Sequence, residues 1–576
     1  MALKQHLLFL LIIVSATIAV YSSTFSGQFV YDDIDYIVKN HAIRSLDSRS
    51  AASFFFDNRT TSADEGLSRD VWRPLVTLSF AIDYRLWALN PRLFHIENSI
   101  LHAIAAILVY MTIFAILKDG FGAFIAAILF AIHPVQVEAV APCSGRTNVL
   151  FAVFFLASFL CHIKNTGLRL IPYLLSLALY LAGLLSKEMA VTLPVLMLAY
   201  DLYFRKKEKA GYYALYYLPY AVLASFYIFM RSLVIGVMAQ KTEWWGGGVI
   251  SNVLVMIKAI KEYIVLSVAP SDMNAYRFPE IPSSVIDPAV ISSGILFLTV
   301  LLAFIYLRRN KAASFFVLWF FIALLPVSNI IPIKAIMAER FLYLSIAGYG
   351  ALFGMAFSKT VRLQDVNRRI RLVITGIFAS ALVYYGILSI SRNVEWSNEL
   401  FFYMADAKRA PGHPKPHYNL AYAYTREAVK RSASSRGEAL GYFLLAEREY
   451  GLSLSIKPLS AVNYSGLGYL YMEFGQYEKA VKNLKKSLVL KEDANAYNNL
   501  AVCYNRIGRY ADAADTSRKA IRIHPGHAKA WVNLGNAYFA LKENQKARMA
   551  WVHASDLGYR DAKLSRIIED LEREDL

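Results

Sequence analysis

Long apolar segments dominate the first 390 residues of the chain. Eleven of them are long enough to cross the roughly 30 Å of hydrocarbon in a bilayer. We predict membrane spans at 5–22, 96–117, 122–141, 147–163, 170–185, 189–204, 213–232, 287–306, 312–331, 341–358 and 371–390. The first run also fits a cleaved signal peptide, because Lys4 precedes a short apolar core and small residues follow it. With either interpretation, the segment after this run lies on the outer side.

The charges between the spans predict the topology. With a cytoplasmic N-terminus, the inner loops read LKDGFG, HIKNTGLRL, RKKEKAG, RRNKAA and KTVRLQDVNRRIR, and four of these five are clearly basic. Basic loops stay in the cytoplasm. Two outer loops, 23–95 and 232–286, and everything after residue 391 then lie outside. The apolar segment 251–269 contains three charged residues, so we predict an interfacial or re-entrant helix on the outer face.

The C-terminal part of the chain has a repeating pattern. AYNNLAVCYNRIGRYADAADTSRKAIRIHPG and AWVNLGNAYFALKENQKARMAWVHASDLGY align at a spacing of 34 residues, which is the period of tetratricopeptide repeats. NYSGLGYLYMEFGQYEKAVKNLKKSL precedes them, and an interrupted copy comes earlier still. After a connector at 393–416, we predict a domain at 417–576 with about four repeats, at 417–458, 461–493, 494–527 and 528–561. Stacked repeats form a concave surface that suits peptide binding.

Composition supports a membrane protein with a soluble appendage. The chain has 576 residues, of which 56% are hydrophobic and 18% charged, whereas soluble domains average about 25% charged. The net charge of +18 is attributed to basic cytoplasmic loops and not to a nucleic-acid partner. Three cysteines, Cys143, Cys161 and Cys503, are too few and too scattered for a disulfide framework or a metal site. The predicted fold class is all-α: a polytopic membrane domain at 1–392, followed by an extracytoplasmic α-solenoid.

Ionisable residues gather at the predicted outer ends of the spans. A charge inside a bilayer costs roughly 2.5–3.5 kcal/mol on insertion scales, so such residues are rare and usually functional. Taken singly, each also fits an ordinary role as a helix cap, a span terminus, a snorkelling cation or a structural ion pair. Their common side favours one composite site. The residues are Asp32, Asp33, Arg73, His133, Glu138, Arg146, Lys187, Glu188, Glu339 and Arg340.

A composite site of this kind suits a lipid-linked phosphate. Paired carboxylates supply a general base, and clustered cations bind a phosphate and stabilise the charge on a leaving group. Nucleotide sugars and ATP are not expected outside the cell, and the sequence contains no P-loop, no dinucleotide-binding fingerprint and no metal-ligand spacing. We therefore predict no certain cofactor. A divalent ion at Asp32 and Asp33 stays an alternative.

The same motifs resemble those of the transmembrane O-mannosyltransferases that carry tetratricopeptide repeats, within the wider group of C-type glycosyltransferases. The resemblance extends from FVYDDIDYIVKN through HPVQVEAVAPCSGRTNVL, LLSKEMAVTLPVLMLAYD and AERFLYL to SRNVEWSNELFFYMADAKRAPGHPKPHYNLA. It implies a multi-span enzyme that uses a polyprenyl- or dolichyl-phosphate sugar. We expect inverting transfer of the sugar to Ser or Thr hydroxyls of extracytoplasmic proteins. The compact chain and sparse cysteines favour a bacterial inner membrane, with the site facing the periplasm.

The resemblance also implies roles for individual residues. Asp32 is expected to be the catalytic base, with Asp33 supporting it or exchanging roles with it. Four cations are expected to hold the donor phosphate: Arg73, Arg146, Lys187 and Arg340. Four other residues are expected to support them: His133, Glu138, Glu188 and Glu339.

An asparagine recurs at one position of three predicted repeats. Asn419, Asn499 and Asn533 each precede an aligned leucine, whereas the remaining repeat has Gly466 at this place. A ladder of amides can pair with the backbone of an extended acceptor peptide. The alternative is that these side chains only make contacts between repeats.

Two other functions stay open. The first is transfer to an envelope glycan or lipid, against which a peptide-binding repeat array argues weakly. The second is a membrane scaffold whose spans only anchor the repeats, although a scaffold needs no charge cluster. A transporter is disfavoured, because its charged residues are expected near the middle of the membrane.

Overall fold

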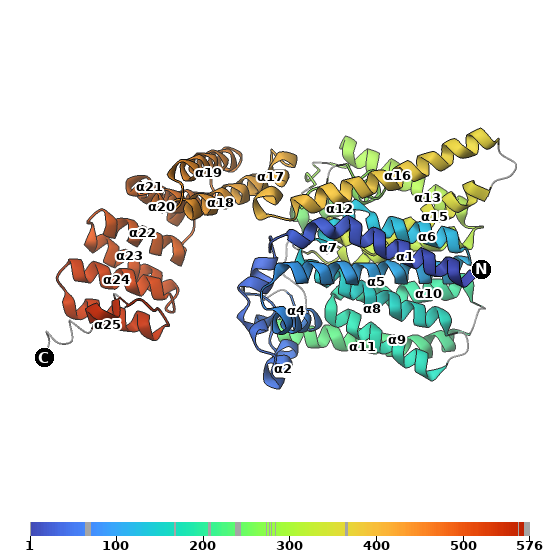
Figure 1. Ribbon diagram of the computed structural model, residues 1–576, viewed down its shortest axis with the longest axis horizontal. Helices are drawn as coiled ribbons and strands as arrows, with labels where there is room; N and C mark the ends of the chain where they lie inside the picture. Colours follow the sequence, from blue (N-terminus) through green and yellow to red (C-terminus); the bar gives the residue numbers. More distant parts are fainter. Residues whose placement is uncertain are drawn as a thin grey trace. The chain divides into compact units, whose positions relative to one another are not determined.

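A computed structural model shows two compact units, unit 1 (Met1–Phe402) and unit 2 (Tyr403–Leu576) (Figure 1). The structure describes residues 2–568 except 64–70, 166–168, 206–208, 237–243, 272, 276, 278, 283, 334, 363–366 and 563. Within these ranges every regular element is a helix, so the all-α prediction is confirmed. The unit boundary follows residue 402 and not residue 392, because Trp396 and Phe402 pack against Tyr31 of unit 1.

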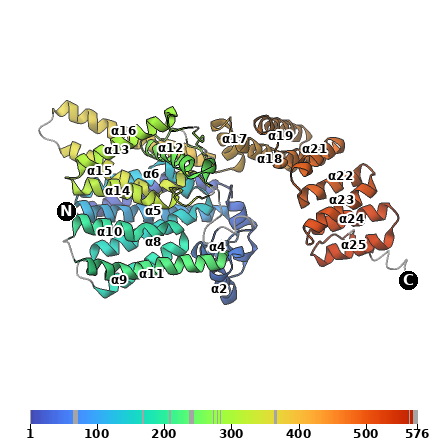
Figure 2. The same cartoon turned by 180° about the vertical axis from the view of Figure 1, so that it is seen from behind.

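Unit 1 is a bundle of mostly long, apolar helices (Figures 1 and 2). In chain order they are α1 (Ala2–Tyr21), α2 (Ser48–Phe56), α4 (Pro74–Trp87), α5 (Pro91–Leu117), α6 (Gly120–Ile132), α7 (Val137–Val140), α8 (Arg146–Lys164), α9 (Leu170–Ser186), α10 (Leu193–Phe204), α11 (Ala210–Ile235), α12 (Val249–Val268), α13 (Pro288–Leu307), α14 (Lys311–Leu324), α15 (Ser345–Arg362) and α16 (Arg368–Glu395). Helix α5 packs against α1, α6 and α8, and α15 packs against α6 and α14. A helix satisfies its own backbone groups, which a chain inside a bilayer requires.

Several helices of unit 1 are suited to cross a membrane. Among the residues that the structure describes, six helices are long and apolar enough: Leu3–Ser26, Pro91–Leu117, Cys143–Lys164, Tyr213–Ile235, Pro288–Leu307 and Arg368–Glu395. A seventh span is formed if Gly120–Ile132 and Pro134–Val140 are one segment, bent by 50° where Pro134 interrupts the helix. These helices indicate a multi-pass membrane protein. Each of the eleven predicted spans overlaps a helix, but the helices α9, α10, α14 and α15 do not meet the same criteria; α9 and α14 are apolar but too short.

The predicted segment 251–269 forms helix α12, which packs against α13. Lys258 donates a hydrogen bond to the Glu280 carbonyl oxygen at 2.8 Å, and Lys261 donates one to Ser292 Oγ at 2.8 Å. Its charged residues are therefore used in contacts with the following loop and with α13. The position of α12 at the outer membrane surface stays a prediction.

Unit 2 is built from helix pairs that follow α17 (Glu399–Arg409), a helix within the predicted connector. The pairs are α18 (Pro414–Arg431) with α19 (Arg436–Ile456), α20 (Ala461–Glu473) with α21 (Tyr477–Leu490), α22 (Ala494–Arg506) with α23 (Tyr510–Ile523), and α24 (Ala528–Ala540) with α25 (Asn544–Asp556). Small residues let the two helices of a pair approach closely. A Cβ on Gly535 would lie 2.3 Å from the Trp551 indole, and one on Gly468 would lie 2.5 Å from Leu484. The sequence pattern predicts this interlocking.

Candidate functional site

Unit 1 contains a cavity of about 550 Å³ whose walls come from segments far apart in the sequence. They include the loop after α1, the start of α4, the α7–α8 turn, the short helices η7 (Glu188–Thr192) and η10 (Glu339–Leu342), and α11. The end of α1 and helices α2 and α4 lie at the same end of the unit in both views (Figures 1 and 2). Six of the predicted site residues line this cavity together: Asp32, Arg73, Glu138, Lys187, Glu188 and Arg340.

Arg340 is held against the cavity wall by Glu138. Its Nη1 donates to Glu138 Oε1, and its backbone N–H donates to Oε2 at 2.9 Å. The Glu138 side chain is buried, whereas that of Arg340 is 29% exposed. The buried carboxylate therefore aims a charged guanidinium at the cavity, in the geometry that suits a phosphate oxygen.

Two more predicted cations belong to the basic wall, which also contains Arg231. Arg73 Nη2 donates to Glu188 Oε1 at 3.1 Å, and Lys187 Nζ donates to Asn148 Oδ1 at 2.5 Å. Burial, reinforced by Arg73 and Arg340, lowers the pKa of Lys187 to about 7. Burial alone would raise the pKa of Glu188, but Arg73 and Lys187 lower it to about 2. Glu188 is therefore a permanent anion, while Lys187 is poised between its charged and neutral forms.

Asp32 is the carboxylate of the opening acidic motif that faces the cavity. It is partly buried, and this burial raises its pKa to about 6. Arg340 opposes the shift, whereas the neighbouring carboxylates of Asp33, Glu138 and Asp35 add to it. A carboxylate with a pKa near neutrality has the proton affinity that a general base needs.

The cavity lining lacks four of the predicted residues: Asp33, His133, Glu339 and Arg146. Asp33 is fully buried and accepts hydrogen bonds from backbone N–H groups. His133 Nε2 lies 3.0 Å from the Ser267 carbonyl oxygen, at the bend between α6 and α7. Glu339 is buried with its carboxylate oxygens 3.7 Å from Arg277 and Arg392. Glu339 is therefore not part of the pocket that its neighbour Arg340 lines. The residue that orients Arg340 is Glu138, and not Glu339 as expected.

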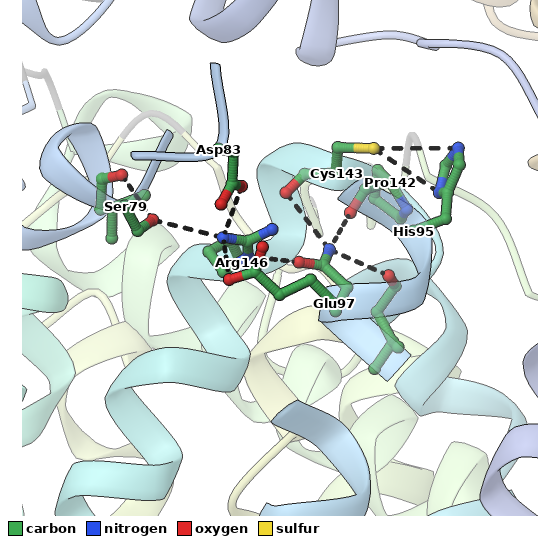
Figure 3. A network of polar contacts seen from close by, with 10 residues as sticks. Ser79, Asp83, His95, Glu97, Pro142, Cys143 and Arg146 are labelled. Carbon is green, nitrogen blue, oxygen red and sulfur yellow. Dashed lines mark hydrogen bonds and ion pairs between the residues drawn. The ribbon is translucent and has the colours of Figure 1, made fainter. Parts of the chain in front are cut away.

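Arg146 was expected to hold the donor phosphate, but the structure places it in an enclosed network (Figure 3). Its side chain is fully buried, with Nη1 at 3.0 Å from both Asp83 Oδ2 and Glu97 Oε1. Its Nε donates to Asn98 Oδ1 at 2.5 Å. These partners come from α4 and α5, so Arg146 joins both helices to the start of α8. This correction could not be made from the motif CSGRTN, because the charge partners are distant in sequence.

Replacing Arg146 by Leu should therefore destabilise the fold. Asp83 and Glu97 would lose their shared cation, and an uncompensated buried charge costs about 3–5 kcal/mol. Thermal unfolding in detergent measures the loss, with the exposed Arg49→Leu as control. An unchanged melting temperature combined with weaker phosphate binding would instead return Arg146 to the donor site.

Further residues line the cavity that sequence reasoning did not single out. Asn148 holds Lys187, and its only sequence signal is its place two residues after Arg146. Aromatic rings also line the walls: Tyr31, Tyr36, Tyr227 and Trp396. Aromatic residues are common throughout this chain, so composition gave no means of selecting these.

No group of three or more His, Cys, Asp or Glu side chains in the described part of the chain is arranged to hold a metal ion. Asp32 faces the cavity, whereas both carboxylate oxygens of Asp33 accept N–H groups of a neighbouring turn. The two acids therefore do not converge on one ligand position.

Of the three predicted asparagines in unit 2, Asn533 makes a side-chain contact between repeats. Asn533 Nδ2 on α24 donates to Asn498 Oδ1 on α22 at 2.8 Å, and Asn498 Nδ2 lies 3.4 Å from Asn499 Oδ1. Asn419 on α18 is partly buried. At Asn533 the inter-repeat alternative is therefore what the structure shows, and the peptide-binding role of all three stays a prediction.

Comparisons with known proteins agree with both units. Tetratricopeptide repeat models match residues 459–526 and 508–556, which confirms that this part of the chain carries tetratricopeptide repeats. The Mus musculus protein O-mannosyl-transferase TMTC3 is 23% identical over 616 residues, covering 96% of this chain and 64% of the relative. The curated relatives of this chain are protein O-mannosyl-transferases. This confirms the resemblance seen in the sequence motifs.

Another protein O-mannosyl-transferase matches a smaller share of this chain than TMTC3 does. F38B6.6 of Caenorhabditis elegans is 29% identical over 430 residues, covering 71% of this chain and 59% of the relative. This chain spans about 64% of the length of TMTC3. Among solved structures, the Archaeoglobus fulgidus oligosaccharyltransferase (15% identity, TM-score 0.39) covers 68% of this chain and 55% of its own. ArnT from Cupriavidus metallidurans, bound to undecaprenyl phosphate (11% identity, TM-score 0.35), covers 90% and 80%.

Proposed function

We propose that this chain is an integral membrane glycosyltransferase that moves a sugar from a polyprenyl-phosphate carrier to Ser or Thr hydroxyls of extracytoplasmic proteins. The observation that carries the proposal is the cavity in which Asp32 shares the walls with Arg73, Lys187 and Arg340. This set pairs one base with a cluster of phosphate-binding cations. The relatives, named protein O-mannosyl-transferases, favour mannose as the sugar.

The cations are proposed to bind the donor phosphate. Arg340 and Arg73 are each oriented by a carboxylate, and Lys187 by Asn148. The two guanidinium groups, and Lys187 in its protonated form, stabilise the phosphate as it leaves with the bonding electrons. Apolar side chains at the cavity wall are exposed to the surroundings, and they offer a path for the isoprenoid chain: Val191, Ile228 and Ile331.

Asp32 is proposed to accept the proton of the acceptor hydroxyl. The hydroxyl oxygen then attacks the anomeric carbon on the face opposite the phosphate, and the bond from that carbon to the phosphate oxygen breaks. The products are the glycosylated protein with an inverted anomeric centre, the polyprenyl phosphate and a protonated Asp32. The transition state is oxocarbenium-like. Aromatic side chains of the walls, Tyr36 and Trp396 among them, suit the flat faces of a sugar.

The cavity and unit 2 are proposed to face the periplasm of a bacterial inner membrane. The basic loops predicted between spans support this orientation. Tetratricopeptide arrays bind extended peptides, so unit 2 is proposed to recruit the acceptor protein. Asn419, Asn499 and Asn533 are the proposed backbone-binding residues of that surface.

A transfer assay with purified protein tests this function. The full chain in lipid nanodiscs is incubated with radiolabelled polyprenyl-phosphate mannose and a periplasmic protein extract. We expect label in protein that is released by β-elimination, which identifies an O-linkage. Label in glycan or lipid would instead identify an envelope glycan or lipid as the acceptor. Absence of both donor binding and transfer to any acceptor would contradict the enzyme and favour the scaffold.

Donor binding should depend on pH through Lys187. Its pKa is about 7 in the free protein: burial lowers it most, Arg73 and Arg340 lower it further, and Glu188 and Glu138 raise it. A phosphate prefers the charged form, so the donor KM should rise above pH 7, by up to about tenfold per pH unit. Lys187→Arg stays charged and should remove most of this rise between pH 6 and 9. An identical pH dependence in this variant would exclude Lys187 from the donor site.

A further inference from the structure

The residue immediately before Asp32 has a strained backbone. Tyr31 has a φ of 59°, in the left-handed region that costs most side-chain-bearing residues about 1–2 kcal/mol. Such strain persists only where the surrounding structure holds it, and it concentrates at functional sites. The direction of the Asp32 side chain depends directly on this peptide.

The Asp33 carboxylate bridges the strained position. Its Oδ2 accepts the N–H of Val30 at 3.1 Å, on the other side of Tyr31. The same oxygen accepts the Cys143 N–H at 3.1 Å, and Oδ1 accepts the Ser144 N–H at 2.7 Å. Asp33 is fully buried. One carboxylate thus closes a tight turn around Tyr31 and fastens it to the turn before α8.

That second turn is itself fixed from α5 (Figure 3). Asn98 Nδ2 donates to the carbonyl oxygens of Val140, Pro142 and Cys143, at 3.2, 2.9 and 3.2 Å. The Asn98 Oδ1 atom accepts from Arg146 Nε, so the amide cannot rotate without losing these contacts.

His95 adds a second connection from α5. Its Nδ1 lies 2.9 Å from the Ala141 carbonyl oxygen, and its Nε2 lies 3.3 Å from that of Gln28. The ring therefore bridges the turn before α8 and the loop that contains Asp32. The anchor of Asp33 is a rigid element, supported by α5 at two points.

We propose that Asp33 is a positioning residue: it holds Tyr31 at positive φ on a turn fixed by Asn98 and His95, and so aims Asp32 into the cavity. This rests on the proposed function, in which Asp32 is the base. Asp33 does not line the cavity, and both of its carboxylate oxygens are engaged by N–H donors. It therefore has no free oxygen to offer an acceptor hydroxyl.

Asp33→Asn tests the proposal through kinetics. The amide NH₂ would face the N–H of Cys143 or Ser144, donor against donor, so the turn should loosen and kcat should fall about 10–100-fold. The donor KM should change less than twofold. The acid limb of the kcat/KM profile should persist but move to lower pH. Burial is the largest cause of the raised pKa of Asp32 and stays in the variant, whereas the negative charge of Asp33, which adds to it as Glu138 and Asp35 do and Arg340 opposes, is lost.

A second substitution separates geometry from chemistry. Glycine adopts positive φ without strain, so Tyr31→Gly in the Asp33→Asn background should recover part of the lost kcat. A lost proton carrier would not be replaced in this way. If Asp33→Asn does not fold, Asp33→Glu keeps both acceptor oxygens one methylene further out and should show an intermediate loss of kcat.

Hydrogen exchange provides a readout that does not need activity. The amides of Val30, Cys143 and Ser144 should exchange faster in Asp33→Asn, whereas Asp32→Asn should leave them protected. If these amides exchange faster in Asp33→Asn but the wild-type protein has no transferase activity, the role of Asp33 in fixing the two turns is upheld and the proposed function is rejected. Unchanged protection with unchanged kcat, or loss of the acid limb in Asp33→Asn, would overturn the proposal.

Discussion

Asp32→Asn should lower kcat by a factor of about 10²–10⁴, the usual contribution of a general base. The amide preserves the shape of the carboxylate but cannot accept the hydroxyl proton. Wild-type kcat/KM should fall below about pH 6, because the pKa of Asp32 is raised to about 6 and the protonated form is inactive. The variant should lack this limb. Transfer assays from pH 4.5 to 8 measure both effects.

The stability of this variant should distinguish lost chemistry from lost fold. Burial raises the Asp32 pKa above its unfolded value, so the ionised carboxylate destabilises the folded state at pH values above about 6. Asp32→Asn removes that charge and should match or exceed the wild-type melting temperature at pH 7.5. Asp35→Asn is a matched control, since Asp35 pairs with the exposed Lys39. Wild-type activity in Asp32→Asn would remove Asp32 from the base role.

Arg340→Gln should have the second large effect, on both activity and stability. The substitution removes the cation that pairs with Glu138 and lowers the pKa of Asp32. Loss of one preorganised group that stabilises transition-state charge lowers kcat about 10²–10³-fold. It also leaves the buried carboxylate of Glu138 unpaired, which costs about 3–5 kcal/mol of folding free energy. Because Arg340 lowers the pKa of Asp32, the acid limb should move to higher pH in any residual activity.

The double variant Glu138→Gln with Arg340→Gln separates these two effects. Two amides of similar size should restore most of the melting temperature, because no buried charge is left uncompensated. Catalysis should stay at the level of Arg340→Gln, since the phosphate still lacks its cation. Recovery of activity together with stability would show that Arg340 acts only as a structural partner of Glu138.

Local patterns in the sequence account for most of the fold. Apolar runs predict helices in unit 1 because a backbone in hydrocarbon must satisfy its own hydrogen bonds. The repeat spacing predicts the helix pairs of unit 2, and at Gly468 and Gly535 it predicts the close approaches as well. These are properties of neighbouring residues, so no tertiary information is needed. The span predicted at 189–204 is different, because the helix α10 covers only Leu193–Phe204 and is too short to cross a bilayer by itself.

Adjacent ionisable residues show where sequence patterns stop being informative. Asp32 and Asp33 are chemically identical neighbours, yet one lines the cavity and the other binds backbone N–H groups. Arg340 likewise faces the cavity while Glu339 is buried away from it. The direction of each side chain follows from the local backbone and from partners on distant helices. A motif lists both residues without distinguishing them.

The amino-acid sequence by itself determined the two-part helical architecture and the set of motifs from which the site is built, because both follow from periodicity and from residue type. Only the tertiary structure decided which charged side chains face the cavity and can bind a substrate. It buried Arg146 between Asp83 and Glu97, and it gave Arg340 the carboxylate of Glu138. A charge is neutralised or exposed according to what lies within a few ångströms of it, and those neighbours are set by packing between segments that are remote along the chain.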